Sequence, residues 1–206
     1  IVDPSPVATE PNDYHLCDTD NDGLASFNLS GVLSEVLGSL NASAHTVTYY
    51  TSLTNAQSET NPITNIFSYP SGTQTIWIRV ENNITGCFDI VTLALITDPI
   101  PLATQPNYPS YSLCDATFPL SYEEFDLGSR INTILLNQTG VTVTFHLNQA
   151  DASSDTNPLP LLYTNTAPFV QTIWIRLENA LTGCFTLSTM DIRVEPLPSP
   201  IPPNQV

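Results

Sequence analysis

The chain has 206 residues, with 20 Asp and Glu against four Arg and no Lys, for a formal net charge of −16. Such a surface repels nucleic acid and anionic lipid, so neither is an expected partner. It suits metal cations, and it keeps an extended chain soluble by self-repulsion. No apolar run approaches 18 residues, so we expect no membrane insertion.

The chain contains two copies of one repeated sequence unit. Residues 74–88 read QTIWIRVENNITGCF and residues 171–185 read QTIWIRLENALTGCF, which agree at 12 of 15 positions. Proline-rich joints open each copy and follow the second one. Proline fixes φ and removes a hydrogen-bond donor, so these joints should be extended and stiff. We therefore predict repeat domains over residues 1–98 and 99–198, with 199–206 as the start of a next repeat or a linker.

The predicted elements recur in the same order in both units. The first unit shows a helix-like apolar spacing at 32–40, then β-rich segments at 46–51, 75–81 and 90–97, with a hairpin turn at 82–86. The second unit shows them at 131–135, 141–146, 172–178 and 187–195, with the turn at 179–183. Asn and Gly in the turns supply the unusual backbone angles that hairpins need.

The segment 75–81 alternates strictly, so Ile76, Ile78 and Val80 should share one face of a strand. Short strands, frequent turns and 41% hydrophobic residues are typical of a one-core β domain in each unit. We predict a mainly β fold, built of two tandem immunoglobulin-like β-sandwich domains, each with a short helical insertion.

Each unit carries one pair of cysteines, and the members of a pair lie 70 residues apart. Metal sites usually bring two ligands close together in sequence, and these spacings do not. We therefore expect two intradomain disulfides, Cys17–Cys87 and Cys114–Cys184. Disulfides of this kind place the chain outside the cytoplasm.

A D-x-D-x-D-G run begins at Asp18 and continues through Asp20 and Asp22. Three carboxylates at alternate positions of a tight loop can converge on one hard cation, so we predict a calcium site here. A complete EF-hand loop would have Glu at its twelfth position, where this chain has Leu29. The loop is therefore a partial one, and the alternative is a solvated acidic turn.

The remaining calcium ligands would come from Asn28, Asp13 or the backbone of Leu24. The second unit has lost the run at 115–119. A second site would need carboxylates from further along that unit, namely Glu123, Glu124 or Asp126.

Two tryptophans, each followed two residues later by an arginine, are a candidate ligand platform: Trp77 with Arg79, and Trp174 with Arg176. Aromatic faces beside polar groups can stack on sugar rings. The alternative is that each tryptophan packs under the helix with its arginine covering the ring.

Catalytic signals are missing from the sequence. The three histidines, His15, His45 and His146, fall in no familiar catalytic spacing, and none matches between the units. There is no G-x-S-x-G elbow, no P-loop and no Rossmann glycine pattern. We predict that the chain is not an enzyme.

The order of motifs resembles a known family. It runs from L-C-D-x-D-x-D-G at residues 16–23 through F-x-L at 27–29 and T-N-P at 60–62 to Q-T-I-W-I-R-V-E-N at 74–82 and T-G-C at 85–87. A Pro-x-Pro joint closes it. This is similar to the tandem repeats of very large flavobacterial cell-surface adhesins that act in gliding.

The resemblance implies export by the type IX secretion system, a place on the cell surface attached to the outer membrane, and a role in adhesion and gliding motility. It implies an extended stalk or contact surface, whose partners are neighbouring repeats of the same chain and surface polysaccharide or another external surface. The alternative is a carbohydrate-binding module of a secreted polysaccharide-degrading enzyme, with Trp77 and Trp174 as its platforms.

Overall fold

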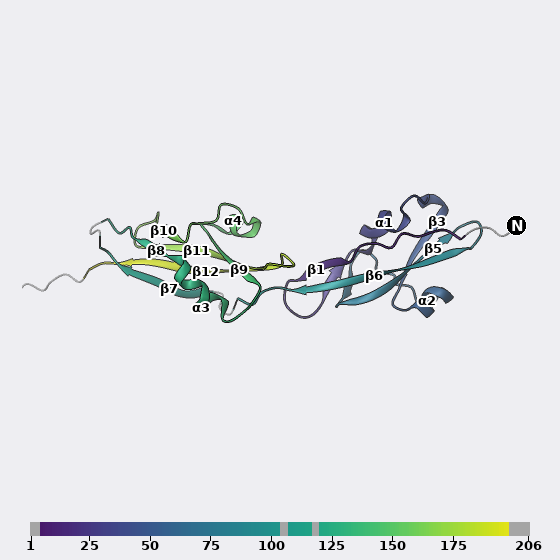
Figure 1. Cartoon of the computed structure of the whole chain (residues 1–206), viewed down its shortest axis with the longest axis horizontal. Helices are drawn as coiled ribbons and strands as arrows, with labels where there is room; N and C mark the ends of the chain where they lie inside the picture. The colour runs from purple at the N-terminus through teal and green to yellow at the C-terminus, as the bar shows by residue number, and fades with distance from the viewer. Residues whose placement is uncertain (1–4, 104–106, 117–119, 198–206) are drawn as a thin grey trace, which may run out of the picture. The chain divides into compact units, whose positions relative to one another are not determined.

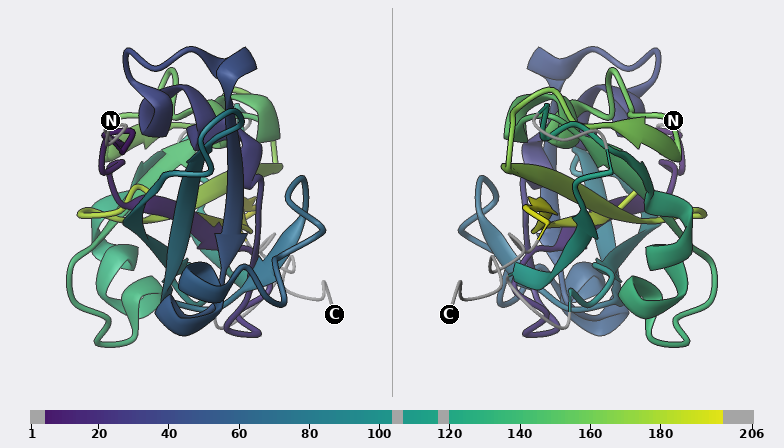
Figure 2. Two further views of the ribbon diagram at one scale, coloured as in Figure 1. Left: turned by 90° about the vertical axis from the view of Figure 1, so that its right-hand side faces the viewer. Right: turned by 90° about the vertical axis from the view of Figure 1, so that its left-hand side faces the viewer.

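The computed structural model describes residues 5–103, 107–116 and 120–197, which fall into two units, Ile1–Pro99 and Ile100–Val206. Figure 1 shows the elements of both units, and Figure 2 shows them from two further sides. The segment 199–206, predicted as a next repeat or a linker, lies outside the described residues.

The main sheet of each unit has four strands in the same order. In the first unit the order is β1 (Tyr14–Asp18), β6 (Phe88–Pro99), β5 (Gln74–Asn82) and β3 (His45–Tyr50). In the second unit it is β7 (Asn107–Cys114), β12 (Phe185–Glu195), β11 (Val170–Asn179) and β9 (Val141–His146). The first strand of each unit runs parallel to the last one, and the other neighbours are antiparallel.

A small antiparallel sheet forms the rest of each sandwich. It pairs β2 (Ala25–Phe27) with β4 (Tyr69–Ser71) in the first unit, and β8 (Glu124–Asp126) with β10 (Leu162–Thr164) in the second. Short helical segments follow β2 and β8: η1 (Leu29–Val32) with α1 (Leu33–Leu37), and η3 (Leu127–Arg130) with α3 (Ile131–Leu135). One more 3-10 turn, η2 (Ala42–Ala44), precedes β3.

The core lies between the main sheet and these smaller elements. Ile76, Ile78 and Val80 have no exposed surface, and they pack with Phe27 and Val36. The second unit repeats this core with Ile173, Ile175 and Leu177 of β11, together with Phe125, Leu127 and Ile134. Each such side chain contributes about 1.5–3 kcal/mol when it leaves water. The predicted alternation along β5 is therefore confirmed.

Two further helices, α2 (Leu53–Ser58) and α4 (Gln149–Ser154), follow β3 and β9. Ser52 accepts a hydrogen bond from the backbone of Asn55 at the start of α2, and Glu59 ends the helix in the left-handed conformation. The sequence pattern predicts neither helix, because each has six residues and buries only one alanine, Ala56 or Ala152.

The predicted fold class is confirmed: the chain is mainly β, with two tandem units built of sheets and a few short helices. The predicted strand at 141–146 coincides with β9, and the predicted helices at 32–40 and 131–135 overlap α1 and α3. The strands β1 and β7 were not predicted, because a single strand beside a proline joint has no distinctive period. Of the helices in the described part of the chain, none is long and apolar enough to cross a membrane.

Candidate functional site

One cysteine of each unit lies at the tip of the hairpin between the two longest strands. In the first unit Asn82 Oδ1 accepts hydrogen bonds from the backbone N–H groups of Ile84 and Thr85, at 3.0 and 3.2 Å. Thr85 Oγ1 then accepts one from the N–H of Cys87. Gly86 has φ +71°, a left-handed conformation that glycine adopts without strain. The second unit makes the same three bonds, with Leu181 in place of Ile84, through Asn179 and Thr182 to Cys184.

The other cysteine of each unit lies at the end of its first strand. Cys17 pairs with Asp98 across β1 and β6, and Cys114 pairs with Glu195 across β7 and β12. Asp98 and Glu195 are at the ends of β6 and β12, so each unit presents this cysteine where its last strand finishes.

The predicted intradomain disulfides are wrong, and the register of the sheets shows why. Asp98, the partner of Cys17, lies eleven residues after Cys87 on a strand that starts at Phe88. At about 3.3 Å per residue the two cysteines are about 35 Å apart, whereas a disulfide needs Cα atoms within about 7 Å. The second unit has the same spacing, because Glu195 lies eleven residues after Cys184.

The cysteines that are disulfide-bonded are Cys17 and Cys184, one from each unit. Cys114, the equivalent of Cys17, is an exposed thiol. Sequence spacing could not reveal which cysteines are bonded, because the two cysteines of a unit are the expected partners until the strand directions are known.

The three predicted calcium ligands are brought together in the loop after β1. Asp18, Asp20 and Asp22 each offer an oxygen, and these atoms lie within 4.8 Å of one another. Asp18 is buried, and its two oxygens accept hydrogen bonds from the N–H groups of Asp22 and Gly23, at 3.2 and 2.7 Å. Among the described residues no other group of three acidic, histidine or cysteine side chains converges in this way.

Burial raises the pKa of Asp18, but the hydrogen bond from the Gly23 backbone and those within the loop outweigh it and leave the pKa below its ordinary value of 3.8. The carboxylate is therefore charged over the physiological pH range. A charged carboxylate has about four acceptor positions, so Asp18 keeps capacity for a cation.

Of the further calcium ligands considered, Asn28 is engaged elsewhere. Its Oδ1 accepts hydrogen bonds from the N–H and the hydroxyl of Ser30, so Asn28 caps the N-terminus of η1. A hollow of about 440 Å³ adjoins the acidic loop and is lined by Leu16, Cys17, Thr19, Asp20, Asp22, Leu24, Ala25, Ser26 and Pro70.

The two arginines of the candidate ligand platform are buried and have protein partners. Arg79 is 6% exposed, and its guanidinium binds Glu81, the carbonyl oxygen of Ala56 in α2 and the face of Phe88, 3.5 Å from the ring centroid. Arg176 repeats these contacts with Glu178, Ala152 and Phe185. Each arginine therefore covers a phenylalanine instead of the tryptophan that the sequence indicated. Trp77 and Trp174 themselves are half-buried.

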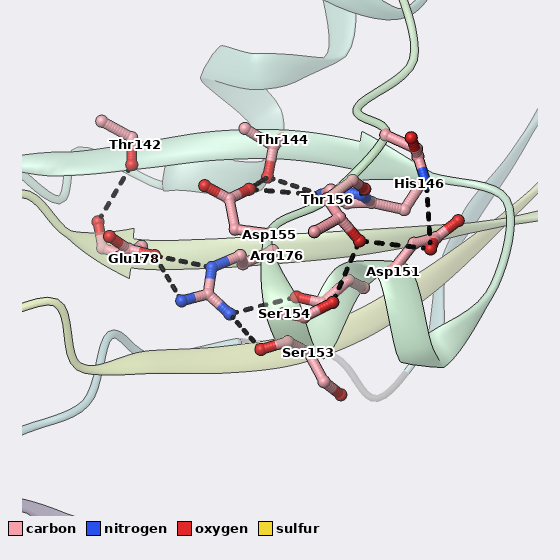
Figure 3. A network of polar contacts seen from close by, with 12 residues as sticks. Thr142, Thr144, His146, Asp151, Ser153, Ser154, Asp155, Thr156, Arg176 and Glu178 are labelled. Atoms are coloured by element: carbon pink, nitrogen blue, oxygen red, sulfur yellow. Dashed lines mark hydrogen bonds and ion pairs between the residues drawn. The ribbon is translucent and has the colours of Figure 1, made fainter.

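A polar network that the sequence did not reveal surrounds His146 in the second unit (Figure 3). His146 has no exposed surface, and its Nδ1 lies 2.9 Å from the carbonyl oxygen of Thr156, so this nitrogen carries a proton and donates it. Its Nε2 lies 2.9 Å from Thr144 Oγ1 and 3.6 Å from Asp155 Oδ1.

An acid, a histidine and a hydroxyl together resemble a nucleophilic catalyst. In a catalytic triad, however, the acid and the hydroxyl bind opposite nitrogens of the histidine. Here Thr144 and Asp155 both lie at Nε2, and Nδ1 of the fully buried His146 binds a backbone carbonyl. Its partners Asp155 and Thr156 directly follow α4, and Arg176 binds the last turn of the same helix through Ser153. The network therefore fastens α4 to the sheet, which is a structural role.

The comparison with family models decides the identity of the repeat. The model described as the Flavobacterium inter-domain disulphide bond domain matches residues 13–101 and again residues 110–198. The chain belongs to this family. Both matches contain one hairpin cysteine and one first-strand cysteine. Membership in the inter-domain disulphide bond family fits the finding that the bonded cysteines, Cys17 and Cys184, come from different units.

No curated protein matches the chain significantly. Several solved structures resemble it weakly. The cadherin-like domains 1 to 4 of zebrafish RET share 8% identity at a TM-score of 0.27, over 74% of this chain and 39% of that one. Titin domains Z1Z2, in complex with telethonin, share 11% identity at a TM-score of 0.25, over 96% of this chain and 100% of that one. The extracellular cadherin domains of protocadherin gamma B2 share 12% identity at a TM-score of 0.24, over 89% of this chain and 38% of that one.

The chain is thus a tandem-repeat module of an extracellular, disulfide-containing type. Its two units consist of structural β domains.

Proposed function

We propose that this chain is a non-enzymatic repeat segment of a secreted cell-surface adhesin, exported by the type IX system and acting as a stalk or contact surface in adhesion and gliding motility. The observation that carries the proposal is the pair of bonded cysteines in two different units of a tandem repeat. A bond between successive units helps a load-bearing stalk, because it resists separation of neighbours, whereas it gives no advantage to an active site. The buried ion pairs of Arg79 with Glu81 and of Arg176 with Glu178 stabilise each unit internally, which supports the same view.

We further propose that Cys17 and Cys184 are bonded to each other. Cys17 lies where the last strand of the first unit ends, and Cys184 lies at a hairpin tip of the following unit. The chain-entropy model gives such a cross-link about 5 kcal/mol, because it closes a loop longer than 100 residues in the unfolded chain. Non-reducing peptide mapping of the purified protein should yield one linked pair of peptides containing these two cysteines. Any other pairing contradicts this proposal.

The adhesin function is tested in the parent organism. Replacing both Cys17 and Cys184 by Ser in the full-length protein should leave its secretion intact and reduce surface attachment under flow, because the units separate under load. The matched control replaces Ser110 and Ser112 in β7 by Ala, which leaves the cysteines in place. Unchanged attachment and gliding in cells that lack the whole segment would contradict an adhesive role.

We also propose that the acidic loop at Asp18, Asp20 and Asp22 holds calcium. Three carboxylates with oxygens within 4.8 Å carry concentrated negative charge, and a divalent cation with oxygen ligands neutralises it. Such an ion would stiffen the loop that follows Cys17, next to the joint. The corresponding segment of the second unit includes residues 117–119, which lie outside the described residues.

The second candidate function is a carbohydrate-binding module, and the half-buried rings of Trp77 and Trp174 are the observation in its favour. Their neighbours Arg79 and Arg176 are already engaged by protein groups, which leaves each ring without a guanidinium for sugar hydroxyls. Tryptophan fluorescence titrated with algal and bacterial polysaccharides separates the two functions. Saturable quenching that disappears in Trp77→Phe would favour the module over the stalk.

A further inference from the structure

The hydroxyl of Thr144 lies between two acceptors that compete for its one proton. It is 2.9 Å from Nε2 of His146 and 3.3 Å from Oδ1 of Asp155 (Figure 3). The other ring nitrogen, Nδ1, already holds a proton, which it donates to the carbonyl oxygen of Thr156. In a neutral imidazole Nε2 is therefore a bare acceptor. One hydroxyl proton cannot serve both Nε2 and Asp155, so one of them goes without this donor while His146 is neutral.

A second proton on the imidazole removes this competition. Nε2–H then donates to the Thr144 oxygen, and the Thr144 hydroxyl is free to donate to Asp155. The relay joins an imidazolium to a carboxylate whose oxygen lies 3.6 Å from Nε2. Hydrogen bonds of charged groups are about twice as strong as neutral ones. Burial opposes the charged ring, but three oxygens surround it, from the Thr156 carbonyl, the Thr144 hydroxyl and the Asp155 carboxylate.

The charged groups of the neighbouring elements also favour the imidazolium. On the side of α4 these are Asp155 and Asp151, and Asp151 accepts a hydrogen bond from the hydroxyl of Thr156. On β11 they are Arg176 and Glu178, which form an ion pair with each other. Three carboxylates and one guanidinium leave an excess of negative charge around the ring, and this charge attracts a proton.

The relay acts on the end of a helix. Asp155 ends α4 in the left-handed conformation, at φ 50°, and its N–H donates to the carbonyl of Asp151. A residue other than glycine keeps this conformation where the surrounding structure holds it. We propose that His146, Thr144 and Asp155 form a proton-controlled latch: acidification protonates His146 and tightens α4 on the sheet, and deprotonation loosens it. This device does not depend on the adhesin function.

The first unit is a natural comparison, because it has the same helix end without the histidine. Glu59 ends α2 at φ 55°, as Asp155 ends α4, and Thr48 matches Thr144 in the repeat. The residue at the position of His146 is Tyr50, which is fully buried and whose hydroxyl has no hydrogen-bond partner in the described part of the chain. A tyrosine offers no cation at any pH, so α2 should lack the response.

The test is hydrogen exchange of the full chain, measured by mass spectrometry from about pH 8 to pH 5, where histidine changes its charge. Exchange is expressed as protection factors, which correct for the intrinsic pH dependence of the chemistry. Protection of α4 should rise about fivefold on acidification, the difference between a neutral hydrogen bond and one to a charged group. Protection of α2 should not change. Asp155→Asn and His146→Tyr should each abolish the rise, whereas Glu124→Gln, on the small sheet of the same unit, should keep it.

Nuclear magnetic resonance of the nitrogen-15-labelled imidazole rings follows the proton itself. His146 should gain its second proton over the range in which α4 becomes protected, and the variants His15→Gln and His45→Gln assign the other two rings. A His146 ring that keeps one proton down to the lowest pH would overturn the proposal. So would an α4 whose protection stays constant or falls in acid, or a full rise in Asp155→Asn. The side chain of Asp155 is 49% exposed, so this variant tests the latch even where His146→Tyr disturbs the packing.

Discussion

The guanidinium of Arg79 lies over the face of Phe88, 3.5 Å from the ring centroid, and Arg176 lies over Phe185 at the same distance in the second unit. In each unit the arginine comes from the middle strand and the phenylalanine starts the last one. The same guanidinium binds a carbonyl of the helix that follows the third strand. One side chain therefore joins two strands and a helix at the hairpin end that carries the cysteine.

Arg79→Ala should lower the free energy of unfolding of the first unit by about 3 kcal/mol, because it removes one partner of a buried ion pair and leaves Glu81 and the Ala56 carbonyl without their donor. Arg79→Lys should recover only part of the loss, since lysine lacks the planar fork. Hydrogen exchange over α2, measured by mass spectrometry, follows the first unit alone. The matched control is Arg193→Ala, whose pair with Asp191 is more exposed than that of Arg79 with Glu81, so its loss should cost less than about 1 kcal/mol.

The neighbouring tyrosines Tyr49 and Tyr50 should respond oppositely to loss of the hydroxyl. Tyr49 donates a hydrogen bond to the Leu29 carbonyl at 2.8 Å, so Tyr49→Phe should cost about 1 kcal/mol. The buried hydroxyl of Tyr50 has no hydrogen-bond partner among the described residues, so Tyr50→Phe should be neutral or stabilising. Urea denaturation of both variants gives the comparison. A larger loss for Tyr50→Phe than for Tyr49→Phe would contradict it.

Burial raises the pKa of Tyr49 to about 12, and this also makes a pH prediction. A group whose pKa is raised on folding contributes stability that is complete below its ordinary pKa of 10.0 and is lost as the pH rises through the folded value. The first unit should therefore lose stability between about pH 10 and pH 12, and Tyr49→Phe should remove this dependence. The second unit has Phe145 at the equivalent position and serves as an internal control.

In acid, Asp18 should give the stability of the first unit the opposite pH dependence. Its pKa is lower in the folded state than its ordinary value of 3.8, so it stabilises the first unit above that pH, and the contribution is lost as the pH falls through the lower folded value. Melting curves from pH 5 down to pH 2.5 should show a steep loss that is reduced in Asp18→Asn. A Glu124→Gln variant, whose carboxylate belongs to the second unit, should keep the steep loss.

Calcium should raise the melting temperature of the first unit, since a ligand that binds only the folded state adds about 2.7 kcal/mol at a concentration 100 times its dissociation constant. Asp20→Asn and Asp22→Asn should each weaken the binding strongly, as measured by titration calorimetry on the full chain, because each removes one of three converging carboxylates. Glu124→Gln should bind like the unmodified chain. Identical melting curves in calcium and in chelator would show that the loop is only an acidic turn.

The sequence by itself determined the features that depend on local pattern. The repeat was visible as identity between residues 74–88 and 171–185, and the buried face of β5 followed from its alternation of Ile76, Ile78 and Val80 with polar or aromatic neighbours. The convergence of Asp18, Asp20 and Asp22 followed from spacing within one tight loop. Short-range geometry fixes all of these, since a strand repeats every two residues and a loop of five residues cannot separate its ends.

Only the tertiary structure decided the cysteine chemistry and the role of the arginines. Cys17 and Cys87 share a unit, but β1 runs parallel to β6 and places Cys17 beside Asp98, at the far end of the strand from the hairpin. A parallel pairing of segments about 80 residues apart leaves no periodic signal in the sequence. The contacts of Arg79 likewise depend on α2, a helix too short to be seen in the pattern. Strand direction and side-chain contacts between distant segments are set by packing of the whole core, which local propensity does not encode.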